Sequence, residues 1–306
     1  MTTTTTIEEG QARTVSTGKG ASLAKIMVAT DFSPVSKRAL DYAVALARRF
    51  GSELYLTHVL LYTKYPVTDP GPFPTPAELR EGAKKRIQDI IDSGSLYGVR
   101  YQVVVEEGDL WPMLEMMLAK HGIDLLVVGT HGMNAGMKAI FGSSAEEAFR
   151  RARVPVLTVG PAITAEAPFE VELRNILFAT AFGPAAEREA ELAFALAREH
   201  RSRLLMMHVT VRPDGFSEFD AEAERKAITK KLEELVPAGA TAQCKPEFCV
   251  AYGNPVEEIL RDAHQVKADL IVIGAKKGGA LAGHNLHSKA FAVVRGAGCP
   301  VLTVKS

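Results

Sequence analysis

The sequence predicts an α/β fold made of two tandem Rossmann-like domains, each a parallel β-sheet flanked by helices. Three observations support this prediction. The chain has 306 residues, which suits two domains better than one. Similar segments recur in a constant order along it. Within each copy, apolar β-prone runs alternate with helical patterns, which implies parallel strands joined by right-handed crossovers.

The internal repeat consists of six pairs of matching segments. Residues 43–48 (AVALAR) match residues 193–198 (AFALAR), and the early pairs all lie 150 residues apart. The later pairs, such as residues 155–159 and 300–304 (both PVLTV), lie 145 residues apart. One change of offset in a constant order indicates a duplication, with about five extra residues between the second and fourth strands of the first copy.

The elements of the first copy follow from local signals. An apolar run predicts a strand at residues 25–30. Ser33 is a good N-cap, Pro34 suits the first helical position, and Gly51 ends the helix. The remaining predicted elements are a strand at 53–59, a helix that starts with the capping box of residues 75–78, a strand at 99–105, a helix at about 110–120, a strand at 124–128, a helix after Gly142 and a strand at 156–159.

Composition limits the possible partners. Acidic and basic residues balance at 36 each, so nothing in the charge favours nucleic acid or an acidic membrane. No apolar run approaches the length of a membrane span, and residues 1–22 predict a disordered polar tail without a signal-peptide core. Three cysteines do not make a disulfide framework, so we expect a cytoplasmic protein. Alternating charges on the helices predict solvated faces.

Two loops of the first copy lie where ligands bind in parallel sheets, at the carboxyl ends of strands. One follows the first strand and contains Thr30 and Asp31. The other follows the fourth strand and begins at Gly129. Glycines let the backbone approach an anion, and a helix N-terminus favours negative charge. Ser143 and Ser144 add hydroxyl donors at that helix start, whereas His131 would contact either phosphate or solvent.

The second loop carries the pattern Gly-x2-Gly-x9-Gly-Ser as Gly129, Gly132, Gly142 and Ser143. With this pattern the chain resembles the universal stress proteins in their tandem form. The resemblance implies five-stranded sheets of order 3-2-1-4-5. It also implies that residues 156–159 and 301–304 join the halves into an intramolecular pseudo-dimer, and that whole chains could form a homodimer. The implied domains are residues 23–162 and 172–306, with a linker at 163–171.

In the ATP-binding branch of that family, the glycines and serine of this pattern hold the phosphates. The resemblance therefore implies an adenine nucleotide, ATP, in the first domain. Asp31 would contact the nucleoside and Val59 would frame the adenine. Magnesium would be held mainly by the phosphates themselves.

The second copy departs from this pattern at three positions. Ala181 replaces the aspartate, and Lys277 and His287 replace two of the glycines. A Cβ and a long side chain should keep the backbone away from a phosphate. We therefore expect the second domain to be a degenerate structural partner, with one ATP bound per chain.

Three functions stay open on the sequence alone. The first is a nucleotide-binding stress-response or regulatory module. The second is a slow ATPase or phosphotransferase, although no Walker lysine or paired acidic metal site and no catalytic residue is identified. The third is a scaffold without nucleotide. The glycine loop could instead be a tight turn, and Asp31 a helix cap or turn residue. His58 and His208 are expected to be packed rather than catalytic.

Overall fold

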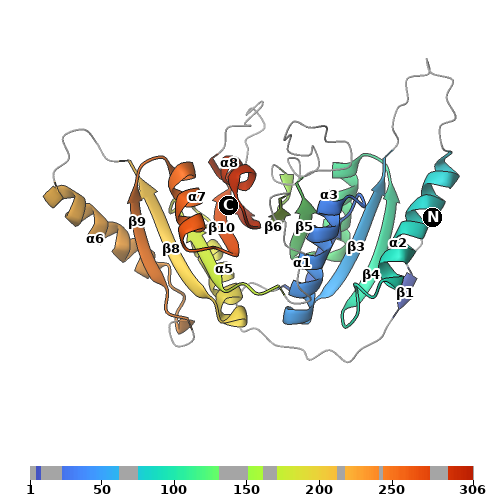
Figure 1. Cartoon of the computed structure of the whole chain (residues 1–306), viewed down its shortest axis with the longest axis horizontal. Helices are drawn as coiled ribbons and strands as arrows, with labels where there is room; N and C mark the ends of the chain where they lie inside the picture. Colours follow the sequence, from blue (N-terminus) through green and yellow to red (C-terminus); the bar gives the residue numbers. More distant parts are fainter. Residues whose placement is uncertain are drawn as a thin grey trace, which may run out of the picture. The chain divides into compact units, whose positions relative to one another are not determined.

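The computed structural model describes residues 5–7, 23–61, 75–130, 151–160, 171–211, 218–240, 244–275 and 289–305 (Figure 1). The chain divides into two compact units. The first comprises Met1–Val15 and Leu23–Ala148, and the second Ser16–Ser22 and Phe149–Ser306. All three cysteines are free thiols. Among the described helices, none combines the length and the apolar character that a membrane span requires.

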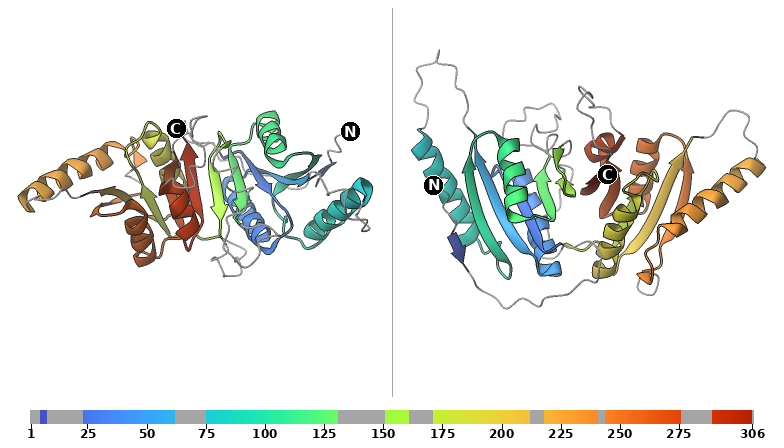
Figure 2. Two further views of the ribbon diagram at one scale, coloured as in Figure 1. Left: turned by 90° about the horizontal axis from the view of Figure 1, so that it is seen from above. Right: turned by 180° about the vertical axis from the view of Figure 1, so that it is seen from behind.

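The first unit contains a sheet of parallel strands in the order β4-β3-β2-β5. Its strands are β2 (Lys25–Ala29), β3 (Glu53–Leu60), β4 (Arg100–Glu107) and β5 (Leu125–Gly129), and its helices are α1 (Pro34–Phe50), α2 (Pro76–Asp92) and α3 (Leu110–His121). Helices α1 and α2 cover one face of the sheet and α3 covers the other (Figure 2). These are the first four strands of the predicted order 3-2-1-4-5, which is confirmed.

A short strand from the N-terminal tail extends this sheet. Within the segment 1–22, for which we predicted disorder, β1 (Thr5–Ile7) pairs antiparallel with β4. Strand β4 would otherwise present unpaired backbone groups along its outer edge, and threonine and isoleucine favour extended backbone. The edge and the composition of the tail together explain this pairing.

Helix α1 begins directly after the loop that contains the predicted site residues Thr30 and Asp31. The side chain of Ser33 caps the helix by accepting a hydrogen bond from the backbone of Ser36, and Pro34 occupies its first turn. Gly51 ends the helix with a positive φ of 65°, which glycine adopts without strain. The buried face, which includes Leu40 and Ala43, packs against the sheet. The sequence prediction for this helix is therefore confirmed at both ends.

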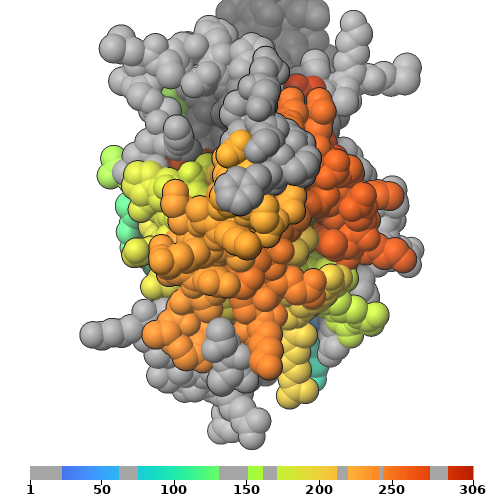
Figure 3. All heavy atoms as spheres, turned by 90° about the vertical axis from the view of Figure 1, so that its left-hand side faces the viewer, coloured from blue at the N-terminus to red at the C-terminus, as the bar shows by residue number. Residues whose placement is uncertain are grey.

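The second unit has the full predicted order, β9-β8-β7-β10-β11, with all five strands parallel. Its strands are β7 (Asn175–Ala179), β8 (Arg203–Thr210), β9 (Glu247–Tyr252), β10 (Leu270–Ala275) and β11 (Val301–Lys305), and its helices are α5 (Ala186–His200), α6 (Glu218–Glu234), α7 (Pro255–Gln265) and α8 (Lys289–Gly296). The outer surface of α6, in orange at the centre of Figure 3, carries ion pairs from Glu222 to Arg225 and Lys226.

The last strand of the first repeat is built into the second unit. Strand β6 (Val156–Val159) pairs antiparallel with β11, with Leu157 opposite Leu302. Two buried threonines strengthen the pairing: the Oγ1 of Thr158 donates to the carbonyl of Val301 (3.0 Å), and that of Thr303 donates to Val156 (3.2 Å). The expected pairing of the two final strands is confirmed.

The duplication is preserved in long-range hydrogen bonds. The amide of Lys25 donates to Asp124 at 2.9 Å, and the amide of Asn175 donates to Asp269 at 2.8 Å. These contacts anchor the start of the first strand of each repeat to the start of its fourth strand. The two repeats thus share interior contacts as well as sequence.

Candidate functional site

Thr30 organises the loop that follows β2. Its backbone amide donates to the carbonyl of Thr57 on β3 (2.9 Å), and its Oγ1 accepts from the amide of Phe32 (3.0 Å). The same Oγ1 lies 3.1 Å from the Oγ of Ser36 on α1. Because the Thr30 side chain is buried, these bonds fix the loop between the strand and the helix.

Asp31 takes part in the turn itself. Its Oδ1 accepts a hydrogen bond from the amide of Ser33 at 3.0 Å, which is an Asx turn. The residue as a whole is only partly buried, and it lies at the carboxyl edge of the sheet. Asp31 therefore has a local structural role in this turn.

His58 supports the loop from β3. Its Nδ1 lies 2.8 Å from the carbonyl of Thr30, so this nitrogen carries the proton and donates. The His58 ring packs on the ring of Phe32, with 4.5 Å between their centroids. The guanidinium of Arg86 also lies over the Phe32 ring, 5.5 Å from its centroid. Burial lowers the pKa of His58 and outweighs the bond to Thr30, which favours a neutral packed histidine, as expected.

Phe32 has a positive φ of 63°, an uncommon conformation for an aromatic residue. Its counterpart in the second repeat, Phe182, has a φ of 52° and packs on His208 at 4.6 Å. His208 in turn lies 2.8 Å from the carbonyl of Thr180. The same strained turn is thus built twice, which indicates that the scaffold of this loop is a property of the repeat and needs no aspartate.

The packing around Gly129 favours glycine at this position independently of any ligand. A Cβ at this position would lie 3.1 Å from the amide of Ser36 and from the backbone and side chain of Val35, because β5 ends against the first turn of α1. Contacts this close are tighter than most Cβ atoms make, so a side chain here would require the first turn of α1 to move by a few tenths of an ångström, whether or not a ligand is present. The alternative that this glycine is structural is therefore supported for Gly129 itself.

The described part of the predicted site lies on neighbouring strands. Thr30 and Asp31 follow β2, whose neighbours are β3 and β5. Val59 is buried near the end of β3, and Gly129 ends β5. The other predicted positions lie outside the described residues: His131, Gly132, Gly142, Ser143 and Ser144. Their roles stay predictions.

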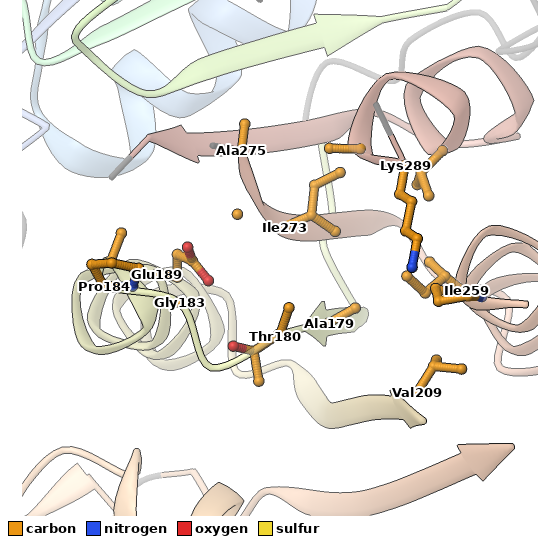
Figure 4. A pocket seen from close by; sticks show the side chains of 16 residues that line it. Ala179, Thr180, Gly183, Pro184, Glu189, Val209, Ile259, Ile273, Ala275 and Lys289 are labelled. Atoms are coloured by element: carbon orange, nitrogen blue, oxygen red, sulfur yellow. The ribbon is translucent and has the colours of Figure 1, made fainter. Parts of the chain in front are cut away.

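The second unit has a cavity of about 200 Å³ at the equivalent end of its sheet (Figure 4). It is lined mainly by aliphatic side chains from β7, β8, β10 and the adjoining helices. Ala181 and Val209, the counterparts of Asp31 and Val59, are among the lining residues. The second repeat therefore has an apolar hollow at this position, where we expected only a structural partner.

Two charged residues line this cavity, Glu189 on α5 and Lys289 on α8. Glu189 is 4% exposed, and burial raises the pKa of its carboxyl to about 7. This corrects our expectation that the charges on the helices face solvent, because the charge pattern of α5 does not reveal which of its glutamates is turned inward. A signal was present in the repeat alignment, in which Glu189 corresponds to the buried Ala39.

The carboxylate of Glu189 occupies the space that a side chain at position 274 would need. A Cβ at Gly274 would lie 2.7 Å from the Cδ of Glu189 and overlap one carboxylate oxygen. No hydrogen bond or ion pair of this carboxylate is found within the described parts of the chain. The same residues contain no cluster of three or more side chains suited to a metal ion.

Comparison with known proteins agrees with the repeat and the fold. The model of the universal stress protein family matches residues 23–160 and again residues 172–305. A universal stress protein from Thermus aquaticus is 36% identical over 135 residues, covering 43% of this chain and 98% of the relative. The universal stress protein A homolog 1 of Coxiella burnetii is 29% identical over 140 residues, covering 44% and 94%.

The fold has a counterpart of nearly full length. The crystal structure of a universal stress protein from Archaeoglobus fulgidus matches with a TM-score of 0.68 over 92% of this chain and 98% of that one, at 21% identity. Both repeats and their order along the chain are therefore found in one known structure. The chain belongs to the universal stress protein family and carries two domains of that family in tandem.

Proposed function

We propose that this protein binds one ATP per chain through its first repeat and acts in the cytoplasm as a nucleotide-dependent stress-response or regulatory module. The observation that carries the proposal is the asymmetry between the repeats. Asp31 and the pattern from Gly129 to Ser143 occur together in the first repeat. In the second repeat the aspartate and two of the glycines are replaced, although the loop scaffold is the same.

The position of the described groups supports this assignment. Asp31 follows β2 and Gly129 is the last residue of β5, so both lie at the carboxyl ends of adjacent parallel strands. This is the edge at which α/β sheets bind ligands, at the point where the strand order reverses. Gly132, Gly142, Ser143 and Ser144 would add backbone and hydroxyl donors for the phosphates, and magnesium would be bound chiefly by phosphate oxygens and water.

The decisive experiment is calorimetric titration of ATP and magnesium into nucleotide-stripped protein. We expect one site per chain. Gly132→Lys, which copies the residue of the second repeat, should abolish most of the binding. Lys277→Gly is the matched control and should create no second site, because Ala181 and His287 remain. Two equivalent sites, or binding untouched by Gly132→Lys, would contradict the proposal.

The alternatives have distinct outcomes. A steady-state assay that shows rapid, saturable ATP hydrolysis, at or above roughly ten turnovers per second, would favour an enzyme. Absence of any nucleotide after purification, together with no titratable binding, would favour a scaffold. We expect nucleotide in the mass spectrum of the purified protein and turnover far below that rate.

A further inference from the structure

We propose that the second repeat has a binding site for a small apolar amine, in the cavity between α5 and the carboxyl ends of β7 and β10, with the carboxylate of Glu189 as its recognition group. The family comparison does not assign this site, and the proposal is independent of ATP binding in the first repeat. It combines three features of the described residues: a hollow of ligand size, an apolar lining and a single inward-facing carboxylate.

The size of the cavity limits the ligand. Its volume of about 200 Å³ is somewhat larger than an engineered cavity of about 150 Å³ that accommodates benzene. A single ring with a short polar arm therefore fits. The lining is aliphatic, with Val209, Ile259 and Ile273 among its members, and such surfaces bind the apolar part of a ligand by excluding water.

Glu189 supplies the polar specificity. Figure 4 shows its carboxylate pointing from α5 toward the cavity, beside Thr180. Its side chain is buried, and no partner for it is found in the described portion of the structure. An ionised carboxylate in apolar surroundings is costly unless it is paired, and a ligand ammonium would provide that pair. In the first repeat the corresponding residue is Ala39, so this feature belongs to the second repeat alone.

Among the residues that the structure describes, the other charged groups at this end of the unit do not pair with Glu189. Lys289 lines the opposite side of the cavity, near Ile259 (Figure 4), and burial is the cause of the raised pKa of Glu189. His208 on β8 is bonded through Nδ1 to the carbonyl of Thr180. A carboxylate at this place also disfavours phosphate, which is consistent with loss of the aspartate and glycines of the nucleotide pattern.

The test uses the full chain stripped of nucleotide and three ligands of similar shape: 2-phenylethylamine, 2-phenylethanol and phenylacetate. Calorimetry at pH 8 should show the amine binding with a Kd below about 1 mM and more tightly than the alcohol, while the acid binds weakest. Tightest binding of phenylacetate would place Lys289 rather than Glu189 in the recognition role. Absence of binding by the amine at millimolar concentration would also overturn the proposal.

The dependence on pH gives an internal check. Because the carboxyl of Glu189 has a pKa of about 7, only about a tenth of it is ionised at pH 6. The affinity for the amine should therefore fall roughly tenfold from pH 8 to pH 6. Glu189→Gln should lose at least about tenfold in affinity at pH 8 and should remove the dependence on pH.

Two controls separate this site from others. Lys289→Ser introduces the serine that the first repeat has at its aligned position, and it should leave amine binding intact or strengthen it, because it removes a like charge. Saturating ATP should not displace the amine. Displacement by ATP, or a Glu189→Gln protein that is folded by circular dichroism and binds the amine normally, would show that the cavity is not the site.

Discussion

Asp31 combines a turn contact with its proposed contact to the nucleoside, and two substitutions separate these roles. Asp31→Ala removes the acceptor of the Ser33 amide and should lower the free energy of unfolding by about 1 kcal/mol. Asp31→Asn keeps an acceptor at the same place and should cost less than about 0.5 kcal/mol. Urea denaturation of the two variants measures the difference.

Nucleotide binding by the same variants tests the functional role. If Asp31 contacts the nucleoside, Asp31→Ala should weaken ATP binding beyond any effect of its lower stability. Ala181→Asp in the second repeat is the matched control and should not confer ATP binding, because Lys277 and His287 remain. If Asp31→Ala leaves the ATP affinity unchanged, the role of Asp31 is limited to its hydrogen bond in the turn.

Glu189 should make stability depend on pH. Its carboxyl has a pKa of about 7 in the folded protein against an ordinary value of 4.5, so the folded state binds more protons between these values. Stability should therefore fall as pH rises from 4.5 through 7 and stay low above it. The loss is on the order of 2 kcal/mol, which is less than the full shift in pKa would give, because solvent screening at the open side of the cavity reduces the effect.

The measurement is urea denaturation of wild type and Glu189→Gln at pH 5 and pH 8. The free energy of unfolding of the variant, taken relative to that of the wild type, should be about 2 kcal/mol higher at pH 8 than at pH 5. The same difference at both pH values would mean that this carboxyl does not titrate in the range that its burial implies. Other titrating groups contribute equally to both proteins and cancel.

At the scale of elements, β10 and α5 pack through the pair of Gly274 and Glu189. Gly274→Ala should destabilise the protein by about 1–3 kcal/mol, because its Cβ forces the buried carboxylate to move. In the double variant Gly274→Ala with Glu189→Ala, this cost should largely disappear, since the smaller side chain leaves room. A double-mutant cycle measures the coupling.

Gly183 provides the matched control for this cycle. It lines the same cavity, and a Cβ there would meet no atom within 4 Å. Gly183→Ala should therefore change stability by less than about 0.5 kcal/mol. Additive effects of Gly274→Ala and Glu189→Ala would show that the two residues are not coupled in solution.

At the scale of the whole molecule, the strand β6 links the two repeats through the chain and supports the second unit. A fragment of residues 149–306 includes β6, whereas a fragment of residues 172–306 leaves the edge of β11 without this partner. The shorter fragment should unfold at a lower urea concentration and should self-associate, because unpaired strand edges attract further strands. Denaturation and sedimentation of both fragments compare these properties.

Ligand linkage gives a second prediction at this scale. ATP should stabilise the chain by about 2.7 kcal/mol at a hundredfold excess over its Kd. The thermal shift with ATP should disappear in Gly132→Lys and persist in Glu189→Gln. A shift that depends on Glu189 instead would assign the nucleotide to the second repeat.

Much of the fold was predictable because its signals are local or repeated. The capping residues Ser33 and Thr75, the terminating Gly51 and the alternation of strands and helices depend on neighbours in the sequence. The duplication added the information that the same set of elements occurs twice. The strand order and the pairing of the final strands were implied by the resemblance to the universal stress proteins, and both agree with the structure.

The binding features were predictable only in part. The sequence by itself determined that Asp31 and Gly129 each come directly after a predicted strand, and that the second repeat lacks the complete pattern. Tertiary structure decided which residues are buried together. It turned Glu189 inward against Gly274, and it left a cavity where the nucleotide pattern is lost. Burial depends on contacts between elements distant in sequence, and a helix with several glutamates does not reveal which of them will face the interior.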